Sequence, residues 1–360
     1  MKKIFIVITF VLFSFLLLPK TVLADSISCP NRYLTLIYPV RDRSLWSDKS
    51  LNPIIQQYTD VKKYSFAATW LLQYDTFNDQ DLTNEIKSFD SKQEKGVFLE
   101  VSKKLAADAN VIYPEGVRWS DPGAVFLSAY SQSDRIRLID QIFSKYKTVY
   151  GVYPKSVGAW WIDSYSLNYM VKKYGVKSVL ICADQKVTDS YGIWGQWWGF
   201  PYKPSKANIL VPASKTNNME NTVVLQWAQR DPILAYGGVG QFSRYSLQAN
   251  DYVVVGKDIN YFKQLTSQYL DCKNSLGQIT VGLETGMESL REPVEYERQL
   301  DYLSTISSLN IVTMRDFAAN YSKVYKINPD NIFFGTENAE WKMTTGYRSV
   351  SSNSNRNPLE

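Results

Sequence analysis

The feature that most constrains the fold of this 360-residue chain is a regular alternation of short β-rich runs with helical patterns. Short strand-like runs that recur between helical stretches are typical of parallel strands joined by helical crossovers. We expect strands near residues 33–38, 65–72, 96–101, 156–160, 177–182, 208–211, 222–227, 278–283 and 310–314. Barrels built from such units reach this length as one domain, so the pattern predicts an α/β barrel.

Two of the intervening stretches have a clear apolar helix face. Apolar residues recur at three- and four-residue spacing from Ile136 to Tyr146, after a possible cap at Asp134, and again from Tyr296 to Ile306. This spacing is that of an amphipathic helix. We expect both faces to pack on the sheet.

The N-terminus resembles a secretory signal. Lys2 and Lys3 precede an apolar run over residues 4–18, and Val22-Leu23-Ala24 offers a small-residue cleavage pattern. We expect cleavage after Ala24 and a secreted or cell-surface protein. The alternative is an uncleaved membrane anchor, although the run is shorter than the ~20 residues of a spanning helix.

The expected domain organisation follows. Residues 1–24 form the signal peptide, residues 25–326 the barrel, and residues 327–360 a strand-like extension that ends in a mobile Ser/Asn-rich tail. Removal of residues 1–24 takes away three lysines and no acid, so the formal charge falls from +5 to +2. Nucleic acid is therefore not expected as a partner, and a membrane is expected only through an uncleaved signal segment.

The chain contains no histidine. This excludes Ser-His-Asp and Cys-His nucleophile systems and His-ligated zinc. Carboxylates are left as acid/base groups, which suits glycosidic bond cleavage by two carboxyl groups without a cofactor. Aromatic residues make up 14% of the chain, including 25 Tyr and 10 Trp, and such rings can stack on sugars. Composition thus favours a polysaccharide or oligosaccharide as the partner.

Four carboxylates follow predicted strands at the end where barrels of this kind bind ligands. They are Asp42, Glu100, Asp163 and Glu284. For each, the alternative to a functional role is a helix N-cap or an ion pair with a nearby arginine such as Arg41. Asp163 and Glu284 are the favoured catalytic candidates, because apolar strands deliver both and two tryptophans precede Asp163.

Several rings and polar side chains near the same strand ends are candidates for a sugar-binding surface. They are Trp160, Trp161, Asp184, Gln185, Trp194, Trp197, Trp198, Trp227 and Arg230, together with Asp42 and Glu100. Residues 184–202 mix polar side chains, rings and glycines, which suits hydrogen bonding to hydroxyl groups combined with stacking on sugar faces. Packing in the core is the alternative for each ring.

The three cysteines permit one disulfide at most. Cys182 lies in an apolar run and is expected to be a buried thiol. Cys29 and Cys272 each precede a predicted strand, and a barrel could bring those two strands together. A Cys29–Cys272 disulfide and two unpaired thiols both remain open.

The succession Gly158–Tyr165, Leu167–Gly175 and Val176–Gln185 resembles the glycoside hydrolase/deacetylase superfamily, whose fold is a seven-stranded (β/α) barrel. The arrangement is most similar to the family 57 glycoside hydrolases, in which a Gly-x-Trp-x-Pro-Glu segment presents the nucleophile. By that resemblance Asp163 takes the nucleophile position. Ala67–Leu72 similarly resembles the second-strand Ala-Thr-Phe pattern of polysaccharide deacetylases. The likeness implies a distorted TIM-like (β/α)7 barrel over about residues 31–320.

The departures from these families are informative. Deacetylases use an Asp and two histidines for their metal, which this chain cannot supply, so metal-dependent deacetylation of that type is not expected. The family 57 first-strand motif carries histidines where this chain reads Leu36–Arg41. The family's acid is an Asp two residues before a late-strand Glu, and here Gly282 stands in that place while Glu284 keeps the other.

These observations lead to a first hypothesis and two alternatives. The first hypothesis is a metal-independent retaining glycoside hydrolase, with Asp163 as nucleophile, Glu284 as general acid/base and no cofactor, which requires carboxyl groups ~5–5.5 Å apart. The alternative is a catalytically inactive polysaccharide-binding protein on the same barrel. A third possibility is a calcium or magnesium ion held by Asp42, Asp163 and Glu284.

Overall fold

The computed structural model describes residues 31–182, 200–232, 234, 244–335 and 339–352. The strands are β1 (Arg32–Val40), β2 (Ala68–Leu72), β3 (Gln93–Phe98), β4 (Ser156–Gly158), β5 (Ser178–Ile181), β6 (Val223–Gln226), β7 (Gly277–Val281), β8 (Asn310–Ile311), β9 (Ile332–Gly335), β10 (Ala339–Met343) and β11 (Arg348–Ser352). The α-helices are α1 (Asn52–Lys63), α2 (Gln80–Ser88), α3 (Lys103–Asp108), α4 (Pro122–Val125), α5 (Gln132–Tyr150), α6 (Ser164–Tyr174), α7 (Ala249–Tyr252), α8 (Ile259–Tyr269), α9 (Pro293–Ser304) and α10 (Met314–Val324).

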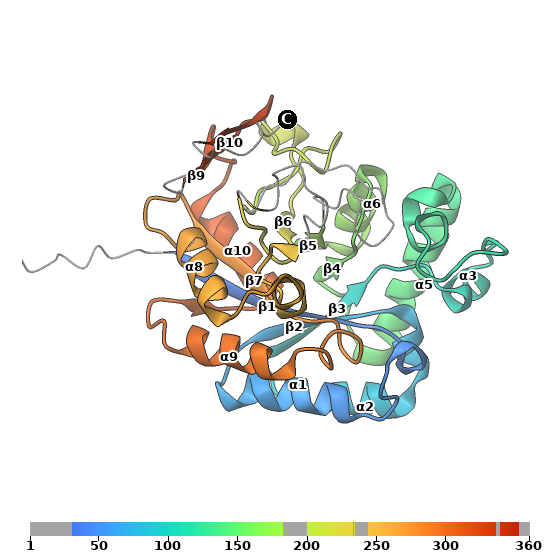
Figure 1. Ribbon diagram of the computed structural model, residues 1–360. Coiled ribbons are helices and arrows are strands. Elements are labelled where there is room, and N and C mark those ends of the chain that lie inside the picture. The colour runs from blue at the N-terminus through green and yellow to red at the C-terminus, as the bar shows by residue number, and fades with distance from the viewer. Residues whose placement is uncertain (1–30, 183–199, 233, 235–243, 336–338, 353–360) are drawn as a thin grey trace, which may run out of the picture.

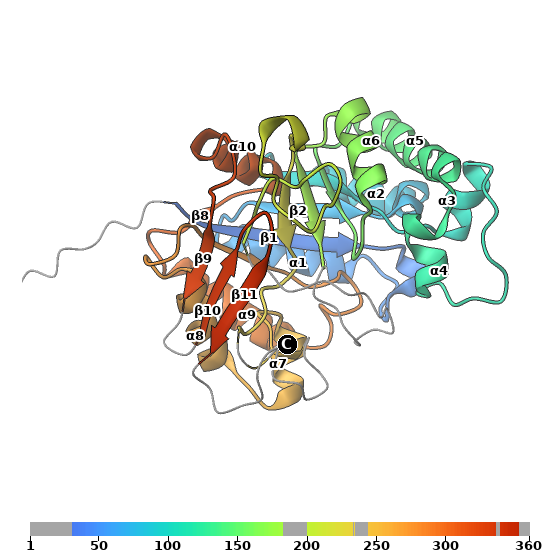
Figure 2. The same ribbon diagram turned by 90° about the horizontal axis from the view of Figure 1, so that it is seen from above.

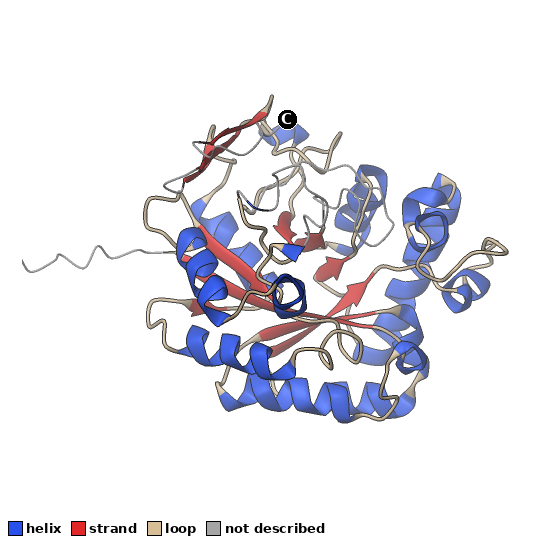
Figure 3. Ribbon diagram, viewed as in Figure 1, coloured by secondary structure: helices blue, strands red, loops and turns tan. Residues whose placement is uncertain are grey.

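Seven parallel strands form the centre of the molecule in the order β6-β5-β4-β3-β2-β1-β7, and the short β8 pairs with the start of β1. The sheet curves into a nearly closed barrel, and helices surround it as crossovers (Figure 3). This confirms the predicted α/β fold, a distorted TIM-like barrel of seven parallel strands. All seven strands run the same way, so their carboxyl ends meet at one mouth.

β1 pairs with three other strands, β2, β7 and β8. All nine of its residues are buried, as its nearly continuous apolar sequence predicts for a strand covered on both faces. Its first half pairs with β7, with Arg32 opposite Gly277, and its second half pairs with β2, with Val40 opposite Leu72. β1 therefore extends past the end of its β7 ladder along β2, and Arg41 follows it at the mouth of the barrel.

A side chain bridges the remaining gap between β6 and β7. Gln229, three residues after β6, accepts a hydrogen bond from the backbone N–H of Thr280 at 2.7 Å. Its amide nitrogen donates to Gln278 at 3.1 Å. Because buried amide groups must find partners, Gln229 supplies contacts between two strands that no ladder joins.

The helices cover the outside of the barrel (Figure 1). The predicted apolar faces are present: Phe143 and Tyr146 on α5, and Tyr296 and Leu300 on α9, are buried. The N-cap of α5 is Ser131 and not Asp134, since the Ser131 hydroxyl accepts the N–H of the first turn. None of the helices in the described ranges is long and apolar enough to cross a bilayer.

The C-terminal strands form a separate antiparallel sheet in the order β11-β10-β9, beside the barrel (Figure 2). Phe334 of β9 stacks on Tyr269 of α8, and the Trp341 indole of β10 donates to the Pro232 carbonyl at 3.2 Å. Both contacts fasten this sheet to the barrel. Arg348–Ser352, within the Ser/Asn-rich segment that was expected to be a tail, form β11.

One predicted strand is wrong. Residues 208–211 form turns, with the Leu210 N–H donating to the Asn208 side chain at 3.0 Å. Isolated bridges such as Pro204–Pro212 flank this segment. Ile209 is nevertheless buried, so its apolar character reflects packing of one side chain and not a strand.

Candidate functional site

A buried arginine lies at the centre of the barrel mouth. Arg41 follows β1 directly, and its Nε and Nη2 both donate to Glu100 at 2.7 Å. Its Nη1 lies 2.7 Å from Oε2 of Glu284, which follows β7. Gln73, the residue after β2, donates to Glu100 at 3.1 Å. Four side chains from the ends of four strands thus form one hydrogen-bonded network.

The charges of this network are deeply buried. Arg41 is 2% exposed, Glu100 is fully buried and Glu284 is 12% exposed. Burial alone lowers the pKa of Arg41, but the charges of Glu100 and Glu284 raise it well above its ordinary value. Burial raises the pKa of Glu100, while the Arg41 charge opposes that rise. Arg41 therefore keeps its positive charge and forms ion pairs with two carboxyl groups.

Aromatic rings surround the guanidinium of Arg41. It lies over Phe98 and Trp119 at 5.2 Å from each ring centroid, and over Trp160 at 5.9 Å. Cation–π contacts of this kind gain strength where water is excluded. Trp160 also meets Trp227 edge to face at 5.4 Å. Two of the predicted sugar-binding rings thus pack on each other next to the network.

A turn over residues 284–289 places a second glutamate beside Glu284. Oε2 of Glu288 accepts the backbone N–H of Glu284 at 3.1 Å, and the Gln248 amide donates to the same oxygen. Burial, followed by the charges of Glu284 and Asp251, raises the pKa of Glu288 well above its ordinary value. Glu288 therefore keeps its proton to a higher pH than an exposed glutamate.

Trp46 holds this turn against β1. Its indole donates to the Arg41 carbonyl at 3.0 Å, and the Ser47 N–H donates to the Gly286 carbonyl at 3.1 Å. Gly286 has a φ of +71°, and a Cβ there would lie 2.2 Å from the Trp46 ring. Only glycine satisfies both conditions, so Gly286 fixes the turn that carries Glu284 and Glu288.

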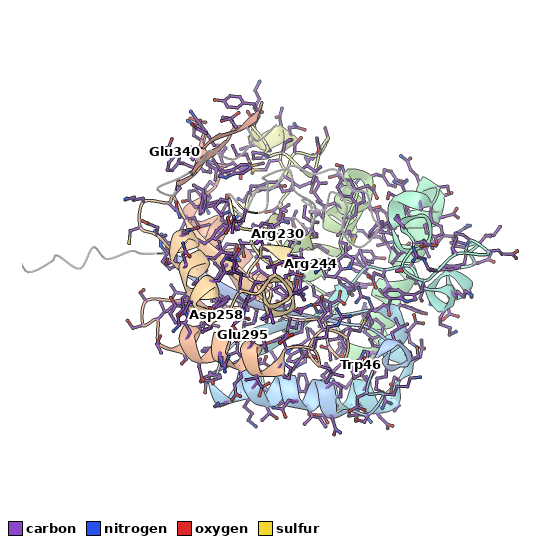
Figure 4. All side chains as sticks on the ribbon, in the orientation of Figure 1. Trp46, Arg230, Arg244, Asp258, Glu295 and Glu340 are labelled. Carbon is purple, nitrogen blue, oxygen red and sulfur yellow. The ribbon has the colours of Figure 1, made fainter. Side chains whose placement is uncertain are left out.

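A second arginine lies on the β6 side of the mouth. Arg230 Nη1 lies 3.1 Å from Asp251, whose other contact at that oxygen is the Ser246 hydroxyl at 2.7 Å. Figure 4 labels Arg230 near the centre of the view and Trp46 beside the N-terminal part of the chain. Within the described part of the chain, arginine side chains thus contact Glu100, Glu284 and Asp251. Glu288 instead accepts hydrogen bonds from the Gln248 side-chain amide and from the Glu284 backbone N–H.

A cavity of about 480 Å³ adjoins the network at the ends of β1, β2 and β3. Asp42, Gln73 and Trp119 line it, so it shares residues with the surroundings of Arg41. Asp75 and Tyr113 also line it, and burial raises the pKa of each. This volume is in the range of small-molecule sites, about 300–1,000 Å³.

Asp163 has a structural environment that differs from the predicted one. It is the N-cap of α6, where its two oxygens accept the N–H of Ser166 at 2.9 Å and the Ser166 hydroxyl at 2.7 Å. Arg135 lies 3.1 Å from the first of these oxygens. Both oxygens are thus engaged by α6 and α5, and the alternative of a helix cap describes Asp163.

The other predicted strand-end carboxylates also have structural partners. Asp42 accepts the Ser44 N–H at 2.8 Å as the N-cap of a short 3₁₀ helix, yet it lines the cavity. Glu100 is fully buried, and both of its carboxylate oxygens accept hydrogen bonds from Arg41. Glu284, the last of the four predicted carboxylates, belongs to the Arg41 network and is partly exposed.

The structure describes only some of the predicted sugar-binding residues. Trp160 and Trp227 are buried at 5% and 3% exposure, Trp161 is half-buried, and Arg230 pairs with Asp251. Five of the predicted residues lie outside the described ranges: Asp184, Gln185, Trp194, Trp197 and Trp198.

The cysteines are partly described. Cys272 is in a disulfide, and Cys182 is a buried thiol whose sulfur accepts a hydrogen bond from Arg230 at 3.7 Å. Cys29, the predicted partner, lies outside the described residues. β1 and β7 are neighbours in the sheet, as the pairing hypothesis requires.

The position expected to correspond to the family 57 acid cannot hold one. A Cβ at Gly282 would lie 1.8 Å from the Ile37 carbonyl oxygen, because the chain after β7 passes directly over β1. A carboxylate at this place requires a different backbone path.

The described residues contain no group of three His, Cys, Asp or Glu side chains that could hold a metal ion. This contradicts the cation hypothesis for Asp42, Asp163 and Glu284, all of which are described.

Sequence reasoning missed several residues of the site: Gln73, Trp119, Gln248 and Glu288. Of these, Glu288 had a usable signal, since it follows Glu284 by four residues and a turn could bring the two together. Arg41 was considered only as a possible ion-pair partner, which is what it is for Glu100 and Glu284.

Comparisons with solved structures identify similar folds. A glycoside hydrolase/deacetylase candidate from Parabacteroides distasonis superposes with a TM-score of 0.63 at 14% identity, covering 91% of this chain and 82% of that chain. Candidate polysaccharide deacetylases from Mycobacterium smegmatis and Pseudomonas aeruginosa give TM-scores of 0.47 and 0.44, each at 10% identity. They cover 83% and 82% of this chain and 93% of each of those chains. No curated protein sequence matches the chain.

The model of one sequence family, DUF3863, matches residues 123–341 and is described as a domain of unknown function with a solved structure. This range spans more than half of the chain and contains β4 to β7, Glu284 and Glu288. The chain belongs to the DUF3863 family and has the nearly closed parallel barrel of glycoside hydrolase/deacetylase proteins.

Proposed function

We propose that the protein is a carbohydrate-active enzyme that hydrolyses glycosidic bonds through the neighbouring carboxyl groups of Glu284 and Glu288. The observation that carries the proposal is their arrangement at the barrel mouth. Glu284 is ion-paired with Arg41, whereas Glu288 is hydrogen-bonded to the Gln248 amide and to the Glu284 backbone. The two groups thus have unlike partners, and burial raises the pKa of Glu288.

Two carboxyl groups in unlike environments are what this chemistry needs. Glu288, whose pKa is raised by burial and by the charges of Glu284 and Asp251, donates a proton to the leaving oxygen as general acid. The Glu284 carboxylate attacks the anomeric carbon as the glycosidic bond breaks. Water, deprotonated by Glu288, then hydrolyses the glycosyl ester. This two-step scheme is that of the retaining class, which requires the two carboxyl groups ~5–5.5 Å apart.

The absence of histidine supports this choice among reactions performed on similar folds. A deacetylase that uses an Asp and two histidines for its metal cannot be built from this sequence. The structure from P. distasonis is described as a glycoside hydrolase/deacetylase candidate, and its likeness to this chain concerns the fold alone. The choice of glycoside hydrolysis therefore depends on the Glu284–Glu288 arrangement.

This proposal moves the chemistry away from Asp163. A family 57 placement would make Asp163 the nucleophile, but its oxygens cap α6 and pair with Arg135. We therefore assign the nucleophile to Glu284 and leave the family 57 kinship out of the proposal.

The alternative function is that of a noncatalytic polysaccharide-binding protein. One observation favours it: Arg41 pairs with Glu284 and with the fully buried Glu100, so both carboxyl groups already have a structural partner. In that case the cavity beside Arg41 would bind glycan without cleavage.

The test is polysaccharide digestion by the wild type, Glu284→Gln and Glu288→Gln, with reducing ends as the readout. Release by the wild type that both amides abolish supports the enzyme. Binding by all three without release supports the binding protein. Asp163→Asn serves as the control for a nearby carboxylate outside the pair.

We also propose that the protein is exported and acts on a polysaccharide outside the cytoplasm. The support is the lysine-led apolar run and the small-residue site ending at Ala24. N-terminal sequencing of protein recovered from the medium or cell surface should begin at Asp25. A chain that retains Met1 in the membrane fraction would instead indicate an anchor.

A further inference from the structure

We propose that the cavity at the ends of β1, β2 and β3 is a subsite for one neutral hexopyranose unit, stacked on Trp119. The inference rests on the proposed function for the class of ligand, and it names a binding site distinct from the Glu284–Glu288 pair. The cavity of about 480 Å³ is large enough for a small ligand.

Trp119 supplies the stacking surface. The Arg41 guanidinium lies over one face of its ring, 5.2 Å from the centroid. The side chain is nevertheless 39% exposed, unlike the neighbouring Trp160 at 5%. Trp119 also lines the cavity. An exposed ring held from behind by a buried cation is suited to pack against the C–H face of a sugar.

The polar lining suits hydroxyl groups. Asp42, Asp75 and Gln73 line the cavity and are half-buried or buried, whereas Lys103 and Lys104, which also line it, are exposed. Carboxylates and amides accept or donate several hydrogen bonds each, which fits the closely spaced hydroxyl groups of a sugar. The formal charges of the two aspartates and the two lysines cancel, and a lining without net charge suits a neutral sugar unit better than an anionic one.

Gln73 connects the cavity lining to the Arg41 network by hydrogen bonds. Gln73 accepts the Asp42 N–H at 3.3 Å on the cavity side and donates to Glu100 in the Arg41 network. Gln73 and Glu100 therefore lie between a sugar in the cavity and Arg41, the residue that pairs with Glu284. We expect the site to bind a unit next to the bond that is cleaved.

The test is calorimetric titration of the wild type with tetrasaccharides of glucose, mannose and N-acetylglucosamine, beside tetragalacturonate. At least one neutral hexose probe should bind. Trp119→Ala should weaken that binding about 3–10-fold, as expected for one lost aromatic contact, whereas Trp119→Phe should retain most of it. Tyr347→Ala, which removes an exposed ring outside the cavity lining, is the matched control.

Three results would overturn the subsite: no binding of any neutral hexose probe, equal binding by the wild type and Trp119→Ala, or tighter binding of the galacturonate probe. The fate of the enzyme proposal is read separately, from reducing-end release. Trp119-dependent binding without release leaves the subsite in place and removes the catalytic role of Glu284 and Glu288. If the wild type releases reducing ends and Trp119→Ala leaves the KM of that reaction unchanged, the catalytic role of Glu284 and Glu288 stands and the subsite is wrong.

Discussion

Replacing Arg41 by methionine should destabilise the fold strongly at neutral pH and much less in mild acid. Methionine keeps an unbranched stem of similar reach but removes three N–H contacts at 2.7 Å, two to Glu100 and one to Glu284. Glu284 is 12% exposed and can turn to water. Glu100 is fully buried and cannot. The variant must therefore either bury an unpaired carboxylate or protonate Glu100.

Protonation sets the size of the effect. Holding a proton at pH 7 on a carboxyl group with an ordinary unfolded-state pKa of about 4.3 costs about 1.4 kcal/mol per pH unit, or about 3.7 kcal/mol. This agrees with the roughly 3–5 kcal/mol lost when one partner of a buried ion pair is removed. At pH 5 the same reasoning gives about 1 kcal/mol. A neutral Glu100 favours the fold below its unfolded pKa, and that advantage is lost as the pH rises.

Urea denaturation followed by circular dichroism at pH 5, 6 and 7 measures this dependence. Arg41→Met/Glu100→Gln should recover most of the stability at pH 7, because no charge is left buried. Lys63→Met is the control, since Lys63 and Glu297 are also 2.7 Å apart but about half exposed; no measurable change is expected there. A loss below about 1 kcal/mol for Arg41→Met at pH 7, or an equal loss at pH 5 and 7, would refute the reasoning.

Three further predictions concern the same region. Burial and neighbouring carboxylates raise the pKa of Glu288, so its contribution to stability is complete below its unfolded-state pKa and is lost as the pH rises through its folded-state pKa. Thermal melts should therefore show Glu288→Gln gaining stability relative to the wild type between pH 4 and 8. A constant difference would contradict this. Asp163→Asn should keep the α6 cap, change stability by less than about 1 kcal/mol and leave glycan release intact; abolished release would restore Asp163 as the nucleophile. Gly282→Ala should lower the free energy of unfolding by about 3 kcal/mol or more, because its Cβ would lie 1.8 Å from the Ile37 carbonyl oxygen. Gly123→Ala is the control, since a Cβ there has no atom within 4 Å. Similar losses for both variants in denaturation experiments would show that the backbone at Gly282 can move.

The barrel was predictable because its signals are local. A strand such as β1 is covered on both faces, so its sequence is almost continuously apolar and stands out from the amphipathic helices around it. The exception was residues 208–211, where one buried side chain, Ile209, gave a short apolar run without a strand. Periodicity alone does not separate these two cases.

The site was harder to predict because its contacts are not local. The ends of the strands indicated Glu284 as a candidate, but the sequence does not say which acid Arg41 contacts, since Glu100 is 59 positions away. The same uncertainty affected Asp163, whose position before α6 suits either an N-cap or a nucleophile. Trp119 lies in a long connection after β3 without a strand end to mark it, so only the fold brings it onto Arg41.

The central claim is that Glu284 and Glu288 cleave a glycosidic bond, and reducing-end release from a polysaccharide panel tests it most directly. The wild type should release reducing ends from at least one polysaccharide, each single amide variant should abolish that release, and Asp163→Asn should not. Release that persists in both Glu284→Gln and Glu288→Gln, with both variants folded, would contradict the account.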